Sequence, residues 1–178
     1  MNINFQKCTE EQMWKFIAHA LAQNGVDVIL VGGAVVSIYT NGAYRSGDLD
    51  FVLNEVSRKK LDKTLLSLNF IKDRRFYKHP ECKHLFLEFA DFPVGIGNDY
   101  QIKPDEVPYK GEVLKIYSPT DCVRDRLASF AFFGARECLD QAVLVANAHE
   151  VDFRKVKKWC KQENILECFS QFISKLKV

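Results

Sequence analysis

Two aspartates interrupt an apolar run near the end of the segment VGGAVVSIYTNGAYRSGDLDFV, residues 31–52. In a strand, residues i and i+2 project from one face, roughly 7 Å apart, so Asp48 and Asp50 point together. Leu49 and Phe51 then face the opposite, packed side. Two adjacent carboxylates repel each other unless a cation neutralises them. Because Mg²⁺ takes carboxylate oxygens together with substrate phosphates, this pair predicts a metal site beside a nucleoside triphosphate.

Two glycines supply the second half of the pattern. Gly32 and Gly33 end an apolar stretch where a strand gives way to a helix, so bare backbone amides and a helix N-terminus could approach phosphate. Separately, a glycine pair and an Asp-x-Asp pair are common in ordinary turns and strand ends. Their order is more specific: strand, Gly-Gly, helix, Arg45-Ser46, then Asp-x-Asp on a strand.

With this order, VGGAVVSIY and YRSGDLDFV resemble the nucleotidyltransferase superfamily, which has the polymerase-β-like fold. They are especially similar to its small bacterial branch of minimal and abortive-infection, antitoxin-type members. The similarity covers residues 28–53. It implies an α+β fold with a mixed sheet, flanking helices and a C-terminal helical part. It also implies transfer of a nucleotide monophosphate from an NTP to an acceptor, with two Mg²⁺ ions and release of pyrophosphate.

The family pattern implies a third acid on a neighbouring strand, and HLFLEFADF offers Glu88 and Asp91. Glu88 lies between Leu87 and Phe89, which copies the apolar-acid-apolar setting of Asp50. Asp91 has the opposite strand parity and lies near the strand end, where acids often form turns. We therefore predict that Asp48, Asp50 and Glu88 are the catalytic, metal-binding carboxylates, with Asp91 as the alternative to Glu88.

Gly32, Gly33, Arg45, Ser46 and Arg126 are the predicted nucleotide-binding residues. Arg45 could neutralise phosphate, pair with an aspartate or simply face solvent. Ser46 could bind a phosphate oxygen or cap the turn. Antitoxin-like relatives often place a basic residue on the corresponding helix near the nucleotide, which makes Arg126 a candidate; an ordinary ion pair with Asp121 or Asp125 is the alternative.

The resemblance leaves two functions open. The first is a Mg²⁺-dependent enzyme that uses an NTP and an acceptor that is RNA, protein or a small molecule. The second is a scaffold that has lost turnover and acts as an antitoxin-like binding protein, with a toxin or another protein as its partner. The second is motivated by Gly33, because many members of the superfamily have a serine there that touches the triphosphate.

Bulk properties are those of an ordinary globular protein. Hydrophobic residues make up 47% of the 178 residues, charged residues 27%, and the net charge of +2 disfavours an obligate polyanion binder. No apolar run reaches the roughly 20 residues that span a bilayer, and the N-terminus lacks a signal-peptide pattern. The six cysteines form no CxxC and the four histidines are dispersed, so we expect reduced, mostly buried thiols in a cytoplasmic protein without a structural zinc site.

The chain is predicted to divide into a nucleotidyltransferase-like α/β domain, residues 1–117, and a helical region, residues 118–178. Thr9 and Gln12 have capping-box spacing, and Gly25 suits a helix end. Ser118-Pro119 announces the first helix of the second part. The expected helices cover residues 10–24, 34–42 and 57–69 and then most of the chain after 118; the expected strands lie in VDVILV, LDFVL, FIKDRRFYK, KHLFLEFADF and EVLKIY.

The segment 91–111 is rich in glycine and proline and follows the strand that carries Glu88. Loops on a rigid scaffold commonly carry specificity, so we predict that it lines one wall of the active-site cleft, with Asn98 or Tyr100 exposed to it. The alternative is a surface connection without contact to substrate.

Overall fold

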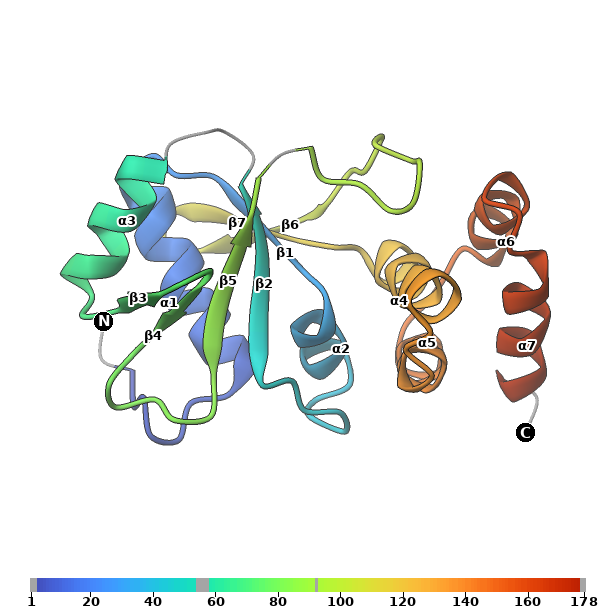
Figure 1. The fold of residues 1–178 in the computed structure, drawn as a ribbon, viewed down its shortest axis with the longest axis horizontal. Coiled ribbons are helices and arrows are strands. Elements are labelled where there is room, and N and C mark those ends of the chain that lie inside the picture. The colour runs from blue at the N-terminus through green and yellow to red at the C-terminus, as the bar shows by residue number, and fades with distance from the viewer. Residues whose placement is uncertain (1–2, 54–57, 92, 177–178) are drawn as a thin grey trace.

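The protein is described by a computed structural model that covers residues 3–53, 58–91 and 93–176. Within these residues a mixed seven-stranded sheet has the order β3-β4-β5-β2-β1-β7-β6 (Figure 1). The strands are β1 (Val28–Val31), β2 (Asp48–Leu53), β3 (Ile71–Asp73), β4 (Phe76–Lys78), β5 (Phe86–Ala90), β6 (Asp105–Tyr109) and β7 (Glu112–Ile116). The helices are α1 (Glu10–Gln23), α2 (Gly33–Tyr39), α3 (Arg58–Ser67), α4 (Pro119–Phe133), α5 (Glu137–Ala148), α6 (Phe153–Gln162) and α7 (Leu166–Leu176). The prediction of an α+β fold with a mixed sheet is confirmed.

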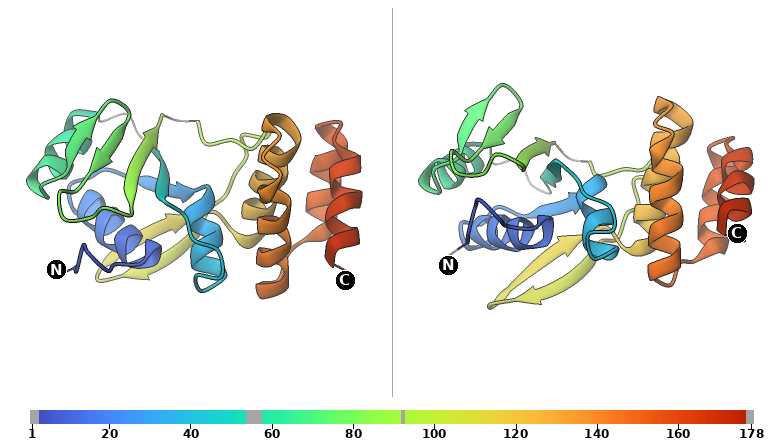
Figure 2. Two further views of the ribbon diagram at one scale, coloured as in Figure 1. Left: turned by 60° about the horizontal axis from the view of Figure 1, so that its bottom comes forward. Right: turned by 90° about the horizontal axis from the view of Figure 1, so that it is seen from below.

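Helix α1 begins with the expected capping box. The Thr9 hydroxyl accepts a hydrogen bond from the Gln12 amide, and the Gln12 side chain accepts one from the Thr9 amide. Gly25, just past the helix end, has φ of +67°, the left-handed conformation that favours glycine. The helix buries one apolar face and lies inside the curve of the sheet, between β5 on one side and β6–β7 on the other (Figure 2).

The central strand β2 sits between two partners. It pairs antiparallel with β1, which sets Val31 beside Asp50, and parallel with β5, which sets Asp50 beside Glu88. Burial alternates along β2 at its start: Asp48 and Asp50 are half-buried, whereas Leu49 and Phe51 are fully buried. The parity expected from the sequence is therefore observed.

Two segments differ from the sequence expectation. FIKDRRFYK forms a hairpin of two short strands, β3 and β4, that turns at Arg74 with φ of +57°. The stretch up to Gly111 is not irregular throughout, because its last part forms the edge strand β6, paired antiparallel with β7. Pro108 is tolerated in β6 because an edge strand can lack a ladder donor. Residue 57, the first residue of the helix expected over 57–69, lies outside the described residues.

The four C-terminal helices stack beside the sheet, α4 and α5 nearest to it and α6 and α7 outermost (Figures 1 and 2). Ser118 caps α4 by accepting a hydrogen bond from the Asp121 amide, and Pro119 occupies the first helical position, as predicted. All six cysteines are free; five are buried and Cys168 is half-buried. In the described part of the chain, no helix is both long and apolar enough to cross a membrane.

Candidate active site

Three carboxylates lie on one face of two neighbouring parallel strands. Asp48 and Asp50 lie on β2, and Glu88 on β5 is the direct neighbour of Asp50. Leu87 and Phe89, which flank Glu88, are buried on the other face, so Glu88 projects from the same side of the sheet as the aspartates. The pairing of β2 with β5 thus unites three acids from segments about 40 residues apart in sequence.

The arrangement concentrates negative charge. Burial, followed by the neighbouring carboxylates of Asp48 and Glu88, raises the pKa of Asp50 to about 7, and the positive charge of Arg126 opposes this rise. A carboxyl group in this setting is only partly ionised at neutral pH. A bound cation would offset the repulsion from Asp48 and Glu88, which together with burial disfavours the ionised form of Asp50.

Gly32 makes room for this carboxylate. It has φ of +75° and ψ of −154°, and a Cβ built on it would collide with Asp50 Oδ2. A Cβ on Gly33 would lie 2.9 Å from Ser46 Oγ and 3.5 Å from Tyr44 Oη. Both glycines therefore lie directly against polar side chains of the candidate site, which explains why neither position carries a larger residue.

Ser46 and Arg45 are positioned by Glu10, a residue the sequence did not single out. Glu10 is only 3% exposed; one of its oxygens accepts from the Ser46 amide at 2.9 Å and the other pairs with Arg45 at 2.9 Å. Burial alone would raise the pKa of Glu10, but hydrogen bonds from the backbone, Ser37 and Arg45 outweigh it and lower the pKa. No local pattern marks Glu10, because its partners lie 35 and 36 residues away.

From this support, the Ser46 hydroxyl donates a hydrogen bond to Asp48 Oδ1 at 2.8 Å. This contact is neither of the two roles expected for Ser46, which were binding a phosphate oxygen and capping the turn. The Ser46 side chain instead orients the carboxylate of Asp48. The Arg45 guanidinium pairs with Glu10 rather than with an aspartate, and its side chain is 65% exposed. Part of it is therefore free to meet a solvent-borne anion.

Arg126 enters from α4. Its guanidinium pairs with Asp125 at 2.6 Å and donates to Gln141 Oε1 on α5 at 3.3 Å. It is also close enough to influence Tyr44: burial raises the pKa of the Tyr44 hydroxyl, and the Arg126 charge opposes the rise. The ordinary ion pair with Asp125 is thus present, and the same arginine lies within electrostatic reach of Asp50.

The two candidates for the third acid occupy different settings. Glu88 is 28% exposed and pairs with Arg75, Nε to Oε1, at 3.3 Å. Asp91 lies beyond the end of β5, is 58% exposed and pairs with Arg58 at 2.8 Å. Only Glu88 is a register neighbour of Asp50, so the geometry favours it as the third acid.

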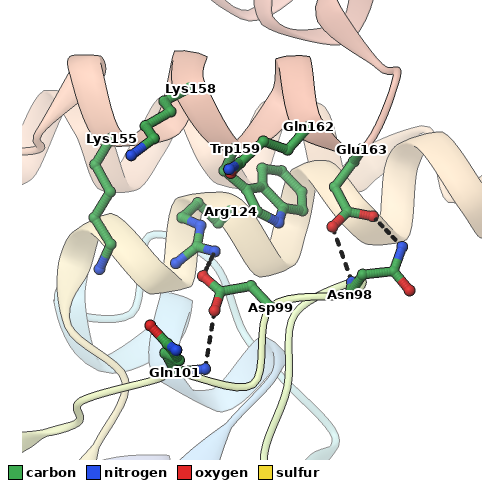
Figure 3. Close-up of a pocket in the computed structure, with 9 residues that line it drawn as sticks. All are labelled: Asn98, Asp99, Gln101, Arg124, Lys155, Lys158, Trp159, Gln162 and Glu163. Carbon is green, nitrogen blue, oxygen red and sulfur yellow. Dashed lines mark hydrogen bonds and ion pairs between the residues drawn. The ribbon is translucent and has the colours of Figure 1, made fainter.

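The segment between β5 and β6 binds the C-terminal helices. Asn98 donates from its amide and its side chain to Glu163, both at 2.9 Å, and Asp99 pairs with Arg124 (Figure 3). The Trp159 indole also donates a hydrogen bond to the Ile96 carbonyl. A cavity of about 480 Å³ opens between this segment and helix α6. These hydrogen bonds anchor the loop to α4 and α6; the prediction that it borders the three carboxylates stays a prediction.

The donor set fits a hard divalent cation. Three carboxylates offer only oxygen ligands. Burial and their mutual repulsion raise the pKa of Asp50, although the charge of Arg126 and the pair of Glu88 with Arg75 offset part of the negative charge. Asp48, Asp50 and Glu88 would hold Mg²⁺, with other coordination positions left for the phosphates of a nucleotide. Their oxygens do not all lie within 4.8 Å of one another, so the side chains would have to close around the ion.

Comparison with known proteins gives matches at the level of structure. A crystal structure of an antigenic nucleotidyltransferase-like protein from Paracoccidioides brasiliensis superimposes with a TM-score of 0.58 at 20% identity, covering 78% of this chain and 75% of that one. A solution structure of the antibiotic-resistance factor ANT(2'')-Ia gives 0.57 at 14% identity over 94% of both chains. A crystal structure of ANT(2'')-Ia in complex with adenylyl-2''-tobramycin gives 0.52 at 14% identity, over 93% and 97%.

No protein-family model matches the chain, and no curated protein matches it. The chain has the nucleotidyltransferase fold, which confirms the fold expected from the Gly-Gly and Asp-x-Asp pattern.

Proposed function

We propose that the protein is a Mg²⁺-dependent nucleotidyltransferase that transfers a nucleotide monophosphate from an NTP to an acceptor hydroxyl or similar nucleophile. The observation that carries the proposal is the register of β2 against β5, which sets Glu88 beside Asp50 on the face that also bears Asp48. The nucleotidyltransferase fold of structures covering most of the chain supports it.

The chain's own residues have distinct roles in this reaction. Asp48 and Asp50 would hold the metal, which would supply charge neutralisation at the triphosphate. Glu88 would complete the carboxylate set and accept the acceptor's proton as the nucleophile bonds to the α-phosphorus and the bond to the departing pyrophosphate breaks. Gly32 and Gly33 let the phosphates approach the backbone, Ser46 fixes the orientation of Asp48, and Arg45 and Arg126 contribute positive charge to the triphosphate.

Titration calorimetry of NTP binding with Mg²⁺ tests the proposal. We expect Asp48→Asn with Asp50→Asn to lower the affinity for Mg²⁺-NTP by about 100-fold or more, since loss of a ligand costs more than loss of a supporting partner. Glu88→Gln should abolish transfer while the fold stays intact. Asp91→Asn is the matched control, because Asp91 is an exposed acid on the same chain segment. Equal binding by the wild type and the double variant would contradict the metal assignment.

Incubation with labelled NTP distinguishes the two proposed functions, an enzyme and an antitoxin-like binding protein. ANT(2'')-Ia is an antibiotic-resistance factor whose crystal structure contains adenylyl-2''-tobramycin, so an aminoglycoside belongs on the acceptor panel together with RNA and cell protein. Transfer of label that requires all three carboxylates supports catalysis. Tight NTP binding without transfer to any acceptor favours the binding protein.

A further inference from the structure

A second group of metal-ligating side chains lies outside the carboxylate site. Cys8, just before α1, meets Cys82 and His84 from the connection between β4 and β5. One ligand atom from each of the three residues lies within 4.8 Å of the other two. From these atoms we infer that Cys8, Cys82 and His84 form a binding site for Zn²⁺, independent of the proposed nucleotidyl transfer.

The separations suit a tetrahedral metal. Zinc binds sulfur at about 2.3 Å and imidazole nitrogen at about 2.0–2.1 Å, so a sulfur and a nitrogen on one zinc lie roughly 3.5–3.6 Å apart. Cys82 Sγ and His84 Nδ1 are 3.7 Å apart in the metal-free arrangement. Cys8 Sγ lies within 4.8 Å of both atoms, so it needs to move only a short distance toward them for all three atoms to bind one zinc ion.

The imidazole is held in the tautomer that a metal requires. His84 Nε2 lies 2.9 Å from the Cys8 carbonyl oxygen, which can only accept, so Nε2 carries the hydrogen. Nδ1 therefore presents its lone pair toward Cys82. A ligating histidine commonly donates its other N–H to a backbone carbonyl in this way, which fixes the ring orientation.

The proposed zinc site has two buried thiol ligands and one ligand at the protein surface. Cys8 and Cys82 are 4% and 5% exposed, whereas His84 is exposed and opens the cluster to solvent. The two chain segments already meet nearby, because the Phe5 ring stacks on His79 with centroids 3.6 Å apart. Two thiolates and an imidazole select a soft cation such as Zn²⁺ over Mg²⁺, and three protein ligands leave a fourth position for water.

Co²⁺ provides the direct test, because thiolate-to-Co²⁺ charge-transfer absorbance reports sulfur ligands and is blind to the carboxylate site. The probe is added to the reduced, tag-free, chelator-treated full chain. We expect saturation at one Co²⁺ per chain, bleaching by one equivalent of Zn²⁺, and a rise in Tm of about 5–10 °C at a zinc concentration near 100 times the Kd.

Variants assign the ligands. Cys8→Ser and Cys82→Ser should lose the charge-transfer band, and His84→Gln, at an exposed side chain that folding tolerates, should weaken binding by about 100-fold or more. Cys168→Ser is the matched control, a free thiol on α7, and should bind like the wild type. The inference is overturned if His84→Gln binds as tightly as the wild type, if no sulfur-to-metal band forms, or if the two thiols simply oxidise to a disulfide without ever taking up zinc.

Discussion

Two clusters of charged side chains in this molecule differ in their charge balance. The carboxylate site gathers Asp48, Asp50 and Glu88 on one face of β2 and β5. The second cluster, called the buried ion network after its buried centre of Arg124 and Asp121, joins these two residues of α4 to the half-buried Asp99 of the β5–β6 segment and the exposed Lys155 of α6. The first combines charges of one sign in a half-buried setting. The second matches two negative charges with two positive ones.

The balance of each cluster indicates its purpose. In the buried ion network, Arg124 pairs with Asp121 at 2.7 Å and with Asp99, and its guanidinium lies 5.2 Å from the centre of the Trp159 ring (Figure 3). Lys155 reaches the same Asp121 oxygen at 2.8 Å. These charges compensate each other, so the network serves to join helices and loop. In the carboxylate site, Arg75 and Arg126 offset only part of the negative charge, and a bound cation would supply the rest.

Removing one member of the buried ion network should have the largest effect on stability. Arg124 is 1% exposed, so Arg124→Met leaves Asp121 and Asp99 without their central partner. We expect the free energy of unfolding to fall by about 3–5 kcal/mol, as is typical when a buried ion pair is broken. Urea denaturation measures this loss. Lys158→Met, an exposed lysine on the wall of the same cavity, is the control and should change stability by less than about 0.5 kcal/mol. A loss below about 1 kcal/mol for Arg124→Met would mean that the network does not join the helices energetically.

Removing a charge from the carboxylate site should raise the free energy of unfolding, the opposite of the effect expected for Arg124→Met. The pKa of Asp50 is raised to about 7, so in the metal-free protein the folded state binds its proton more tightly than the unfolded state does. That contribution to stability is fully present below the ordinary aspartate pKa and is lost as the pH rises through 7. Asp50→Asn mimics the protonated form, and we expect it to stabilise the metal-free protein by about 1–3 kcal/mol above pH 7, after allowance for partial solvent screening.

Denaturation between pH 4 and pH 8 in the presence of a chelator checks this sign. The advantage of Asp50→Asn over the wild type should shrink toward zero at the acidic end. Added Mg²⁺ should stabilise the wild type and not the variant. If Asp50→Asn is less stable than the wild type at pH 8 without metal, the ionised Asp50 carboxylate does not destabilise the metal-free protein, and the prediction is wrong.

The smallest effect is expected at the edge of the carboxylate site. Arg75 is 72% exposed and pairs with Glu88 at 3.3 Å, so Arg75→Ala should change the free energy of unfolding by less than about 1 kcal/mol. Because Arg75 competes with a cation for Glu88, the variant should bind Mg²⁺ slightly more tightly, by about 2- to 5-fold, which is the equivalent of that pair energy. Calorimetric titration with Mg²⁺ decides. The control is Lys78→Ala, which removes an exposed pair with Asp73 and should leave Mg²⁺ affinity unchanged; weaker binding by Arg75→Ala would show that Arg75 supports the site.

Features with a local cause were predictable from the sequence. The capping box at Thr9 and the serine-proline start at Ser118 formed where expected, because each cap is satisfied within a few residues. The common direction of Asp48 and Asp50 follows from the two-residue period of a strand. The turn at Gly32 has a positive φ, which glycine adopts without steric cost, so a glycine at this point is a local turn signal.

Features that depend on pairing between distant segments were not predictable. The hairpin of β3 and β4 was read as one strand because its turn residues, Arg74 and Arg75, carry no glycine or asparagine signal. Glu10 looked like an ordinary first-turn acid, yet it is buried beneath Ser46. The short spacing Cys82-x-His84 was passed over in the sequence, because the cysteines form no CxxC and the histidines as a group are dispersed. The pair gained a third potential ligand only when folding brought Cys8 of the N-terminal segment beside it.

The sequence by itself therefore determined that Asp48, Asp50 and Glu88 were candidates for chemistry and that Asp48 and Asp50 face the same way along their strand. The tertiary structure decided which acid stands beside Asp50, since that depends on the register of β2 against β5. It also decided that the charge of Arg124 is matched within the molecule, whereas the charge of the three carboxylates is offset only in part. The physical reason is range: backbone periodicity and capping act over a few residues, whereas charge compensation and metal geometry depend on atoms that only folding brings within a few ångströms.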